Sequence, residues 1–221
     1  SLGLAGGMFH TLNHAIYIVL LFLTVAAVQY RTGQRDLNEL GGLIKKMPVA
    51  FAGGLLGISG LIGLPLTNGF VSKWLIYKTL ILEGSPFLAF AALIGTWGTI
   101  LSVFKFLHNM FLGQLPEKYK DIKPAPLSMQ VPIVILGSAV LLFGILPGIP
   151  LTWINEIGTS FGFESLNPRL SGIVSGTGTL NIINILAAIV AAGLIIGIIF
   201  RTSRRSVKIG QDDSYAAGAG V

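Results

Sequence analysis

The sequence contains no cysteine and few charged residues. Asp, Glu, Lys and Arg make up 11% of its 221 residues, whereas a soluble domain typically carries about a quarter. The missing cysteine excludes disulfides, thiolate metal sites, iron–sulfur ligation and thiol nucleophiles. Because so few charges cannot cover a globular surface, an ordinary water-soluble enzyme is also excluded. Hydrophobic residues reach 52%, which excludes a disordered chain and indicates a polytopic membrane protein.

Five long apolar runs indicate a helical membrane bundle. One crossing takes roughly 20 residues, and the second run is too long for one simple crossing. We therefore predict an all-α membrane protein with about five transmembrane helices, the second of them discontinuous. The runs cover residues 2–30, 47–82, 87–112, 131–146 and 180–200.

The runs and the segments between them suggest four regions. Residues 1–150 form the main membrane domain, and the less hydrophobic stretch 151–178 is predicted to be an external loop. Residues 179–200 form an additional transmembrane helix, and residues 201–221 a cytoplasmic tail. The chain starts without an initiator Met and enters an apolar run almost at once, so we expect a fragment, a processed product or one module of a larger protein.

Basic residues lie mostly between alternate runs. If the first helix runs from outside to inside, the inner segments hold 11 basic residues and the outer segments hold one, Arg169. This bias predicts a multi-pass protein of the cell membrane with a cytoplasmic C-terminus. It also explains the net charge of +6 by anionic lipid at the membrane surface, without nucleic acid as a partner.

Lys73 is the strongest candidate for a functional residue inside an apolar run. Pro65 cannot continue a regular helix, and Gly63 and Gly69 ease a non-helical link. Backbone groups freed at such a break can bind ions or water. A lysine one turn into the second half-helix can take up and release a proton there. The alternative is a lysine that extends its ammonium group toward the lipid headgroups.

His10 and His14 are four residues apart and share one helix face, with Thr11 and Tyr17 next to that face. Neutral imidazoles can pass protons along a water chain, because one ring nitrogen donates while the other accepts. Two alternatives are a metal-binding pair and a structural, hydrogen-bonded pair. The metal reading is disfavoured because no carboxylate lies in any apolar run and no cysteine completes a ligand set.

Lys105 and His108 are three residues apart near the end of the third run. They either continue a polar track toward the cytoplasm or reach the headgroups from the last turns. Phosphate-binding loops and dinucleotide fingerprints are absent from the sequence. We therefore predict no bound cofactor, no metal and no redox chemistry of the chain's own.

Three blocks of sequence resemble a known family. The segment Met8-Phe9-His10-Thr11-Leu12-Asn13-His14-Ala15-Ile16-Tyr17, the loop 35–48 and the broken run 63–73 occur in the order found in antiporter-like proton-conducting membrane subunits. Such subunits are found in respiratory complex I, in multisubunit sodium/proton antiporters and in membrane-bound hydrogenases. The resemblance covers about residues 1–150 and corresponds to the C-terminal half of a full-length subunit, which is part of an inverted-repeat bundle.

The resemblance implies roles for the candidate residues. Lys73 would exchange protons with the outer half-channel, and His10 and His14 would connect the two half-channels. The chain would translocate protons or sodium ions together with other membrane subunits of a redox-driven or antiporter complex. Two positions depart from the family pattern: Ile18 replaces a common lysine, and Leu66 replaces a common second proline. A structural, non-conducting subunit of the same kind of complex is therefore the alternative.

Overall fold

The computed structural model describes residues 2–175 and 178–202. Within the tail predicted at 201–221, Arg204, Arg205 and Lys208 lie outside the described residues. The chain divides into two units, residues 1–185 and 186–221. The boundary between the two units lies within the last described helix.

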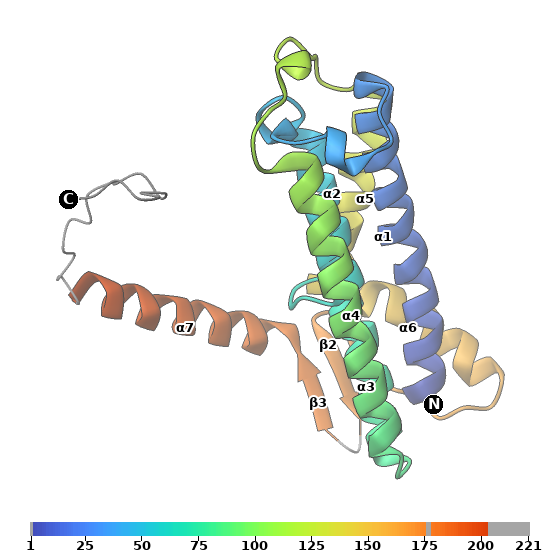
Figure 1. The fold of residues 1–221 in the computed structure, drawn as a ribbon. Helices are drawn as coiled ribbons and strands as arrows, with labels where there is room; N and C mark the ends of the chain where they lie inside the picture. Colours follow the sequence, from blue (N-terminus) through green and yellow to red (C-terminus); the bar gives the residue numbers. More distant parts are fainter. Residues whose placement is uncertain (1, 176–177, 203–221) are drawn as a thin grey trace. The chain divides into compact units, whose positions relative to one another are not determined.

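Helices make up most of the described chain (Figure 1), as the sequence predicts. Four of the described helices, α1, α4, α5 and α7, are long and apolar enough to cross a membrane, and α2 is a shorter apolar helix. The helical elements are α1 (Leu2–Thr32), η1 (Leu37–Glu39), η2 (Leu43–Lys45), α2 (Pro48–Ile62), α3 (Asn68–Leu82), α4 (Pro86–Phe111), η3 (Glu117–Tyr119), α5 (Leu127–Ile145), α6 (Gly148–Ser160) and α7 (Ile182–Thr202).

Helix α1 lies at the centre of the first unit and packs against α2, α3 and α5. Its buried residues recur every three or four positions, which places them on one face. Helix α2 meets this face with glycines, and a Cβ atom built on Gly57 would lie only 2.9 Å from the Leu21 side chain. Small residues of this kind let membrane helices approach closely. The buried face of α1 includes Phe9, Asn13, Tyr17, Leu20 and Thr24.

The second apolar run is broken, as predicted. Helix α2 ends at Ile62, and Gly63 follows with φ 79°, the left-handed conformation of many helix ends. Helix α3 begins at Asn68. Between them Leu66 has φ 71°. Proline is held near −65°, so a proline at position 66 would not fit this backbone.

The stretch predicted to be a loop, 151–178, is largely structured. Most of α6 lies in it, and Pro150 stands in the first turn of that helix, where a missing N–H costs no helical hydrogen bond. A three-stranded antiparallel sheet follows, in the order β1 (Pro168–Arg169), β2 (Gly172–Ser175) and β3 (Gly178–Asn181). Ile173 pairs with both Pro168 and Leu180. Within the described residues, these three short strands are the part of the fold that is not helical or loop.

Candidate functional site

Lys73 lies on the second half of the broken helix and reaches back to the first half. Its ammonium nitrogen donates a hydrogen bond to the backbone carbonyl of Leu61 at 2.9 Å. It also donates to the hydroxyl of Thr96 in α4, at 3.3 Å. A Cβ atom at Gly63 would lie 3.0 Å from the Lys73 side chain, so the stem of the lysine passes over the glycine that ends α2.

The break in the helix explains the partner of Lys73. The residue four positions after Leu61 is Pro65, which has no N–H to donate to the Leu61 carbonyl. Because α2 ends at Ile62, this carbonyl is one of the last four of the helix and needs another partner. The last carbonyls carry the negative end of the helix dipole, which favours a cation. The protonated form of Lys73 therefore fits this position.

A second hydroxyl continues the contacts of Lys73 along α3. The hydroxyl of Tyr77 lies 2.9 Å from that of Thr96. Thr96 in turn donates to the carbonyl of Ala92 at 3.2 Å. Lys73, Thr96 and Tyr77 thus form a continuous set of polar groups between α3 and α4, one turn of α3 in length.

His10 is the histidine that α1 directs toward α3. Its Nδ1 atom lies 3.0 Å from the hydroxyl of Ser72, which is fully buried. Ser72 directly precedes Lys73, so adjacent residues of α3 contact α1 on one side and α2 and α4 on the other. His10 of α1 therefore contacts the turn of α3 that carries Lys73, without a direct bond to Lys73.

His14 lies at the edge of the same helix face and is exposed on the surface of this chain. Its ring centroid is 6.2 Å from that of His10 and 5.3 Å from that of Tyr17, which it meets edge-on. The two histidines are neighbours, as their spacing predicts. The polar face of α1 runs instead through the half-buried His10 and the fully buried Asn13 and Tyr17, at positions i, i+3 and i+7.

Asn13 contacts a second asparagine, Asn68, at the start of α3. The spacing of residues in the sequence did not predict a role for either asparagine. Asn13 and Asn68 are both fully buried, and the Asn13 amide donates to the backbone carbonyl of Asn68 at 2.9 Å. A buried polar group without a partner costs about 1–3 kcal/mol. The signal that could have found them is position: Asn13 is one turn from His10, and Asn68 is the first residue after the break.

Lys105 and His108 lie apart from Lys73. Both are exposed on α4, and the His108 ring contacts its neighbour Asn109 at 3.4 Å. Among the described residues, Lys105 has no hydrogen bond or ion pair. The structure leaves both readings of this pair open. Within residues 2–175 and 178–202, no three His, Cys, Asp or Glu side chains gather closely enough to hold a metal ion.

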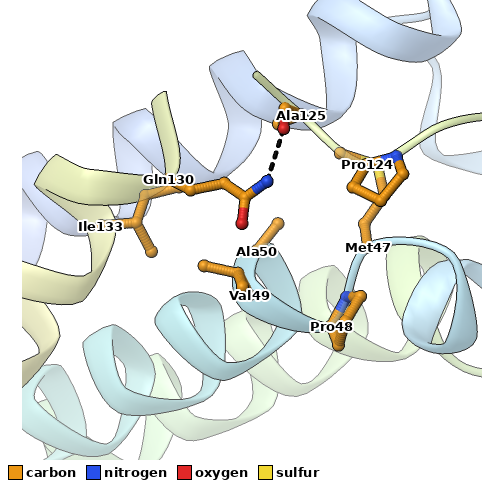
Figure 2. Close-up of a pocket in the computed structure, with 8 residues that line it drawn as sticks. All are labelled: Met47, Pro48, Val49, Ala50, Pro124, Ala125, Gln130 and Ile133. Carbon is orange, nitrogen blue, oxygen red and sulfur yellow. Dashed lines mark hydrogen bonds between the residues drawn. The ribbon is translucent and has the colours of Figure 1, made fainter. Parts of the chain in front are cut away.

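The chain also has a cavity of about 150 Å³, and Figure 2 shows the residues that line it. Met47, the first turn of α2, the segment that precedes α5 and the first two turns of α5 line it, and most of the lining residues are apolar. Gln130 is its polar side chain, and its amide donates to the carbonyl of Ala125. None of the candidate site residues lines this cavity, so it is not part of the site around Lys73.

The comparisons with known proteins agree with this architecture. Residues 1–102 match the family described as NADH:quinone oxidoreductase/Mrp antiporter, TM. One component of the Na(+)/H(+) antiporter of Alkalihalophilus pseudofirmus is 37% identical over 162 residues, which are 67% of this chain and 20% of that protein. Formate hydrogenlyase subunit 3 of Escherichia coli is 35% identical over 156 residues, 66% of this chain and 26% of that protein.

Two solved structures share the fold. A chain of the membrane-bound sulfane sulfur reductase, an archaeal respiratory membrane complex, matches with a TM-score of 0.81 and 31% identity, and the match covers 100% of this chain and 36% of that one. A chain of the Mrp complex from Dietzia sp. matches with a TM-score of 0.63 and 24% identity, over 69% of this chain and 36% of that one. The latter likeness concerns the fold alone.

The resemblance to antiporter-like membrane subunits, predicted from three sequence blocks, is confirmed. The chain is a multi-pass membrane protein with apolar helices. It spans only 20% to 26% of the length of the first two curated relatives.

Proposed function

We propose that this chain belongs to an ion-translocating membrane subunit in which Lys73 exchanges protons beside the broken helix. The observation that carries the proposal is the 2.9 Å hydrogen bond from the Lys73 ammonium group to the Leu61 carbonyl. This bond holds a titratable group on a backbone carbonyl that has no helical partner, because α2 ends at Ile62. The proton is the ion that this chemistry moves, and sodium is the alternative.

Proton exchange at Lys73 changes the charge of its side chain and therefore the strength of its attraction to the end of α2. The protonated group is attracted to the end of α2, and the neutral amine loses this attraction. On release, the proton passes to a neighbouring acceptor, and a second proton later restores the ammonium group. Thr96 and Tyr77 line one side of this position. His10, through Ser72, and then His14 connect the other side of α3 with α1.

A structural, non-conducting subunit is the second candidate function. Ile18, which replaces a common lysine of the family, packs half-buried against the hydrophobic core. That position of α1 therefore supplies no titratable group. In this reading the Lys73 ammonium group serves only to cap α2, which needs a permanent charge and no proton transfer.

The two candidates differ in what they require of Lys73. Arginine keeps the charge but does not release its proton in proteins. We expect Lys73→Arg and Lys73→Ala, each in the assembled complex in liposomes, to lose coupled ion transport nearly completely. Lys78→Arg is the matched control, since Lys78 lies over the Trp74 ring at 4.7 Å, and it should keep transport. Full coupling in Lys73→Arg would favour the structural role.

The orientation is proposed from the basic residues. The loop after α1 and the loop after α4 meet, because the Gly42 amide donates to the Leu112 carbonyl at 2.9 Å. The positive-inside rule then places both loops, together with the C-terminus, on the cytoplasmic side. A cysteine at Ser165 should then react with an impermeant thiol reagent from outside. Reaction of a cysteine at Gln34 from outside would reverse the orientation.

The proposed partners are other membrane subunits and lipids. The two solved structures compared above come from membrane complexes, and the chain matches only part of the corresponding chain in each. Co-purification of the full-length subunit with its neighbours in mild detergent tests this assignment. Isolation of the full-length protein by itself under the same conditions would argue against it.

A further inference from the structure

A second cavity, of about 470 Å³, lies where α1 and α4 both end. The last turns of α1, the turn η1 and the last turns of α4 contribute to its lining. Figure 1 shows these three elements together at one end of the bundle, at the top of the view. Both helices are long and apolar enough to cross a membrane. The cavity therefore lies at the level where such helices reach the lipid headgroups.

The lining of this cavity changes from charged to apolar. Arg35 is exposed, whereas Val28 and Met110 are buried. None of the described residues that line the cavity is acidic. The cavity thus offers a positive charge at its outer end and an apolar wall further in. The apolar wall consists of Val25, Val28, Leu37, Leu40, Phe106 and Met110.

Neutral side chains hold Arg35 at the cavity. The Gln29 amide, oriented with its oxygen toward the guanidinium group, accepts from Nε of Arg35 at 2.9 Å and from Nη2 at 3.2 Å. The side chain of Gln34 accepts from the backbone amide of Arg35 at 2.9 Å. A guanidinium group has five N–H donors, and Gln29 takes two of those of Arg35. The other donors are available to a ligand.

The acidic residues that follow Arg35 in the loop have other partners. Asp36 accepts from the backbone and side-chain amides of Asn38 at 2.9 and 3.0 Å. Glu39 accepts from Lys118 at 2.6 Å. Within residues 2–175 and 178–202, Arg35 forms no ion pair. A guanidinium group without a carboxylate partner suits an anionic ligand, and it can bind a phosphate through two parallel hydrogen bonds.

Charge and size together select the occupant. The volume of 470 Å³ lies within the range of about 300–1,000 Å³ that ligand pockets have. A neutral lipid would leave the charge of Arg35 without a partner. The ammonium group of a zwitterionic headgroup would meet no acidic side chain in the lining. We propose that this cavity binds an anionic phospholipid, with its phosphate on Arg35 and the first part of one acyl chain along the apolar wall.

A lipid in this position would join the loop after α1 to the end of α4. The inference rests on the proposed function in one respect, the assignment of lipids as partners and of these loops to the cytoplasmic side. Basic pockets between membrane helices on that side typically bind anionic headgroups. The inference makes no use of proton exchange at Lys73.

Thermal unfolding of the full-length subunit in its complex tests the site. Phosphatidylglycerol should raise the unfolding midpoint by mass action, and phosphatidylcholine should raise it less. Arg35→Gln should increase the phosphatidylglycerol concentration that gives half of this rise about tenfold, because hydrogen bonds to charged groups are strong. Arg31→Gln is the matched control and should need the wild-type concentration. Arg31 lies at the same end of α1, but it donates to the Pro124 carbonyl at 2.7 Å and does not line the cavity.

Lipid retention gives a readout that does not depend on stability. The complex is mixed with equal amounts of phosphatidylglycerol and phosphatidylcholine, and the lipids that remain bound are identified by native mass spectrometry. Wild type should retain one more phosphatidylglycerol per subunit than Arg35→Gln. Val25→Phe fills the apolar wall without a change of charge, and it should lose the same lipid.

Three results would overturn the proposal. The first is equal retention of phosphatidylglycerol by wild type, Arg35→Gln and Val25→Phe. The second is a midpoint that responds to oleate at lower concentrations than to phosphatidylglycerol, which would assign the cavity to a free fatty acid. The third is loss of a neighbouring subunit from Val25→Phe with no loss of lipid, which would assign it to a protein contact. Neither readout measures transport, so the lipid site and the role of Lys73 can fail separately.

Discussion

Lys73 and Lys105 both interrupt apolar runs, but the structure gives them different surroundings. Lys73 is half-buried and donates to a backbone carbonyl that the helix break exposes. Lys105 lies on the continuous helix α4 and is exposed on this chain. A regular helix uses its own carbonyl groups and offers a lysine no such acceptor. The interruption of the helix, more than the apolar surroundings, therefore provides a binding position for a positive charge.

Transport by lysine variants should show the largest effect of this difference. We expect Lys73→Gln to abolish coupled ion transport in the assembled complex, because the group on the Leu61 carbonyl no longer titrates. Lys105→Gln should lower transport only in part, because Lys105 bonds to no backbone carbonyl among the described residues. Equal loss in the two variants, measured as ion flux into liposomes, would show that α4 carries an equally important group.

Alanine substitutions in the two regions should differ in stability. A Cβ atom on Gly69 would overlap the backbone carbonyl of Gly60, whereas one on Gly95 of α4 meets open space. Overpacking of this kind costs about 1–3 kcal/mol, so Gly69→Ala should lower the unfolding midpoint in detergent. Gly95→Ala should raise stability by roughly 0.5–1 kcal/mol, the usual gain of alanine over glycine in a helix. The comparison fails if Gly69→Ala is as stable as Gly95→Ala.

The smallest effect is expected outside the membrane, where an exposed ion pair joins the two loops. Lys118 donates to Glu39 at 2.6 Å, and this hydrogen bond raises the pKa of Lys118 above its usual value. A raised pKa in the folded state stabilises the fold below the unfolded-state pKa. The contribution disappears as the pH rises through the raised value.

Wild type and Glu39→Gln should therefore differ slightly in unfolding midpoint near neutral pH and converge under strongly alkaline conditions. Salt should reduce the difference in midpoint, because the attraction between the two charges of an exposed ion pair is screened by salt. A difference that persists in alkali would assign the effect to something other than the charge of Lys118.

Much of the fold could be predicted from the sequence because membrane helices follow apolar length. The break was predictable as well, since Pro65 and two glycines stand in the middle of one run. The strands β1 to β3 were not, because two to four residues give no alternating pattern long enough to recognise. Their pairing is set by contacts with the rest of the fold.

The site was predictable in part. Lys73 and the histidine pair follow from spacing and from the cost of charge in a membrane. The hydrogen bonds of His10 to Ser72 and of Asn13 to Asn68 join residues 62 and 55 positions apart. Such pairings depend on how α1 turns its face toward α3, and helical spacing alone does not fix that rotation.

The broken helix also bears on how the chain enters the membrane during synthesis. Helices α2 and α3 have 15 residues each, about 22 Å at 1.5 Å per residue, whereas the hydrocarbon core is about 30 Å thick. Neither half can span the bilayer by itself, so the apolar run 47–82 must be inserted as one segment. The contacts at the separated ends come from α1, α4 and α5, and both α4 and α5 are synthesised later. The two halves therefore reach their final geometry only after insertion, as a late step of assembly within the lipid phase.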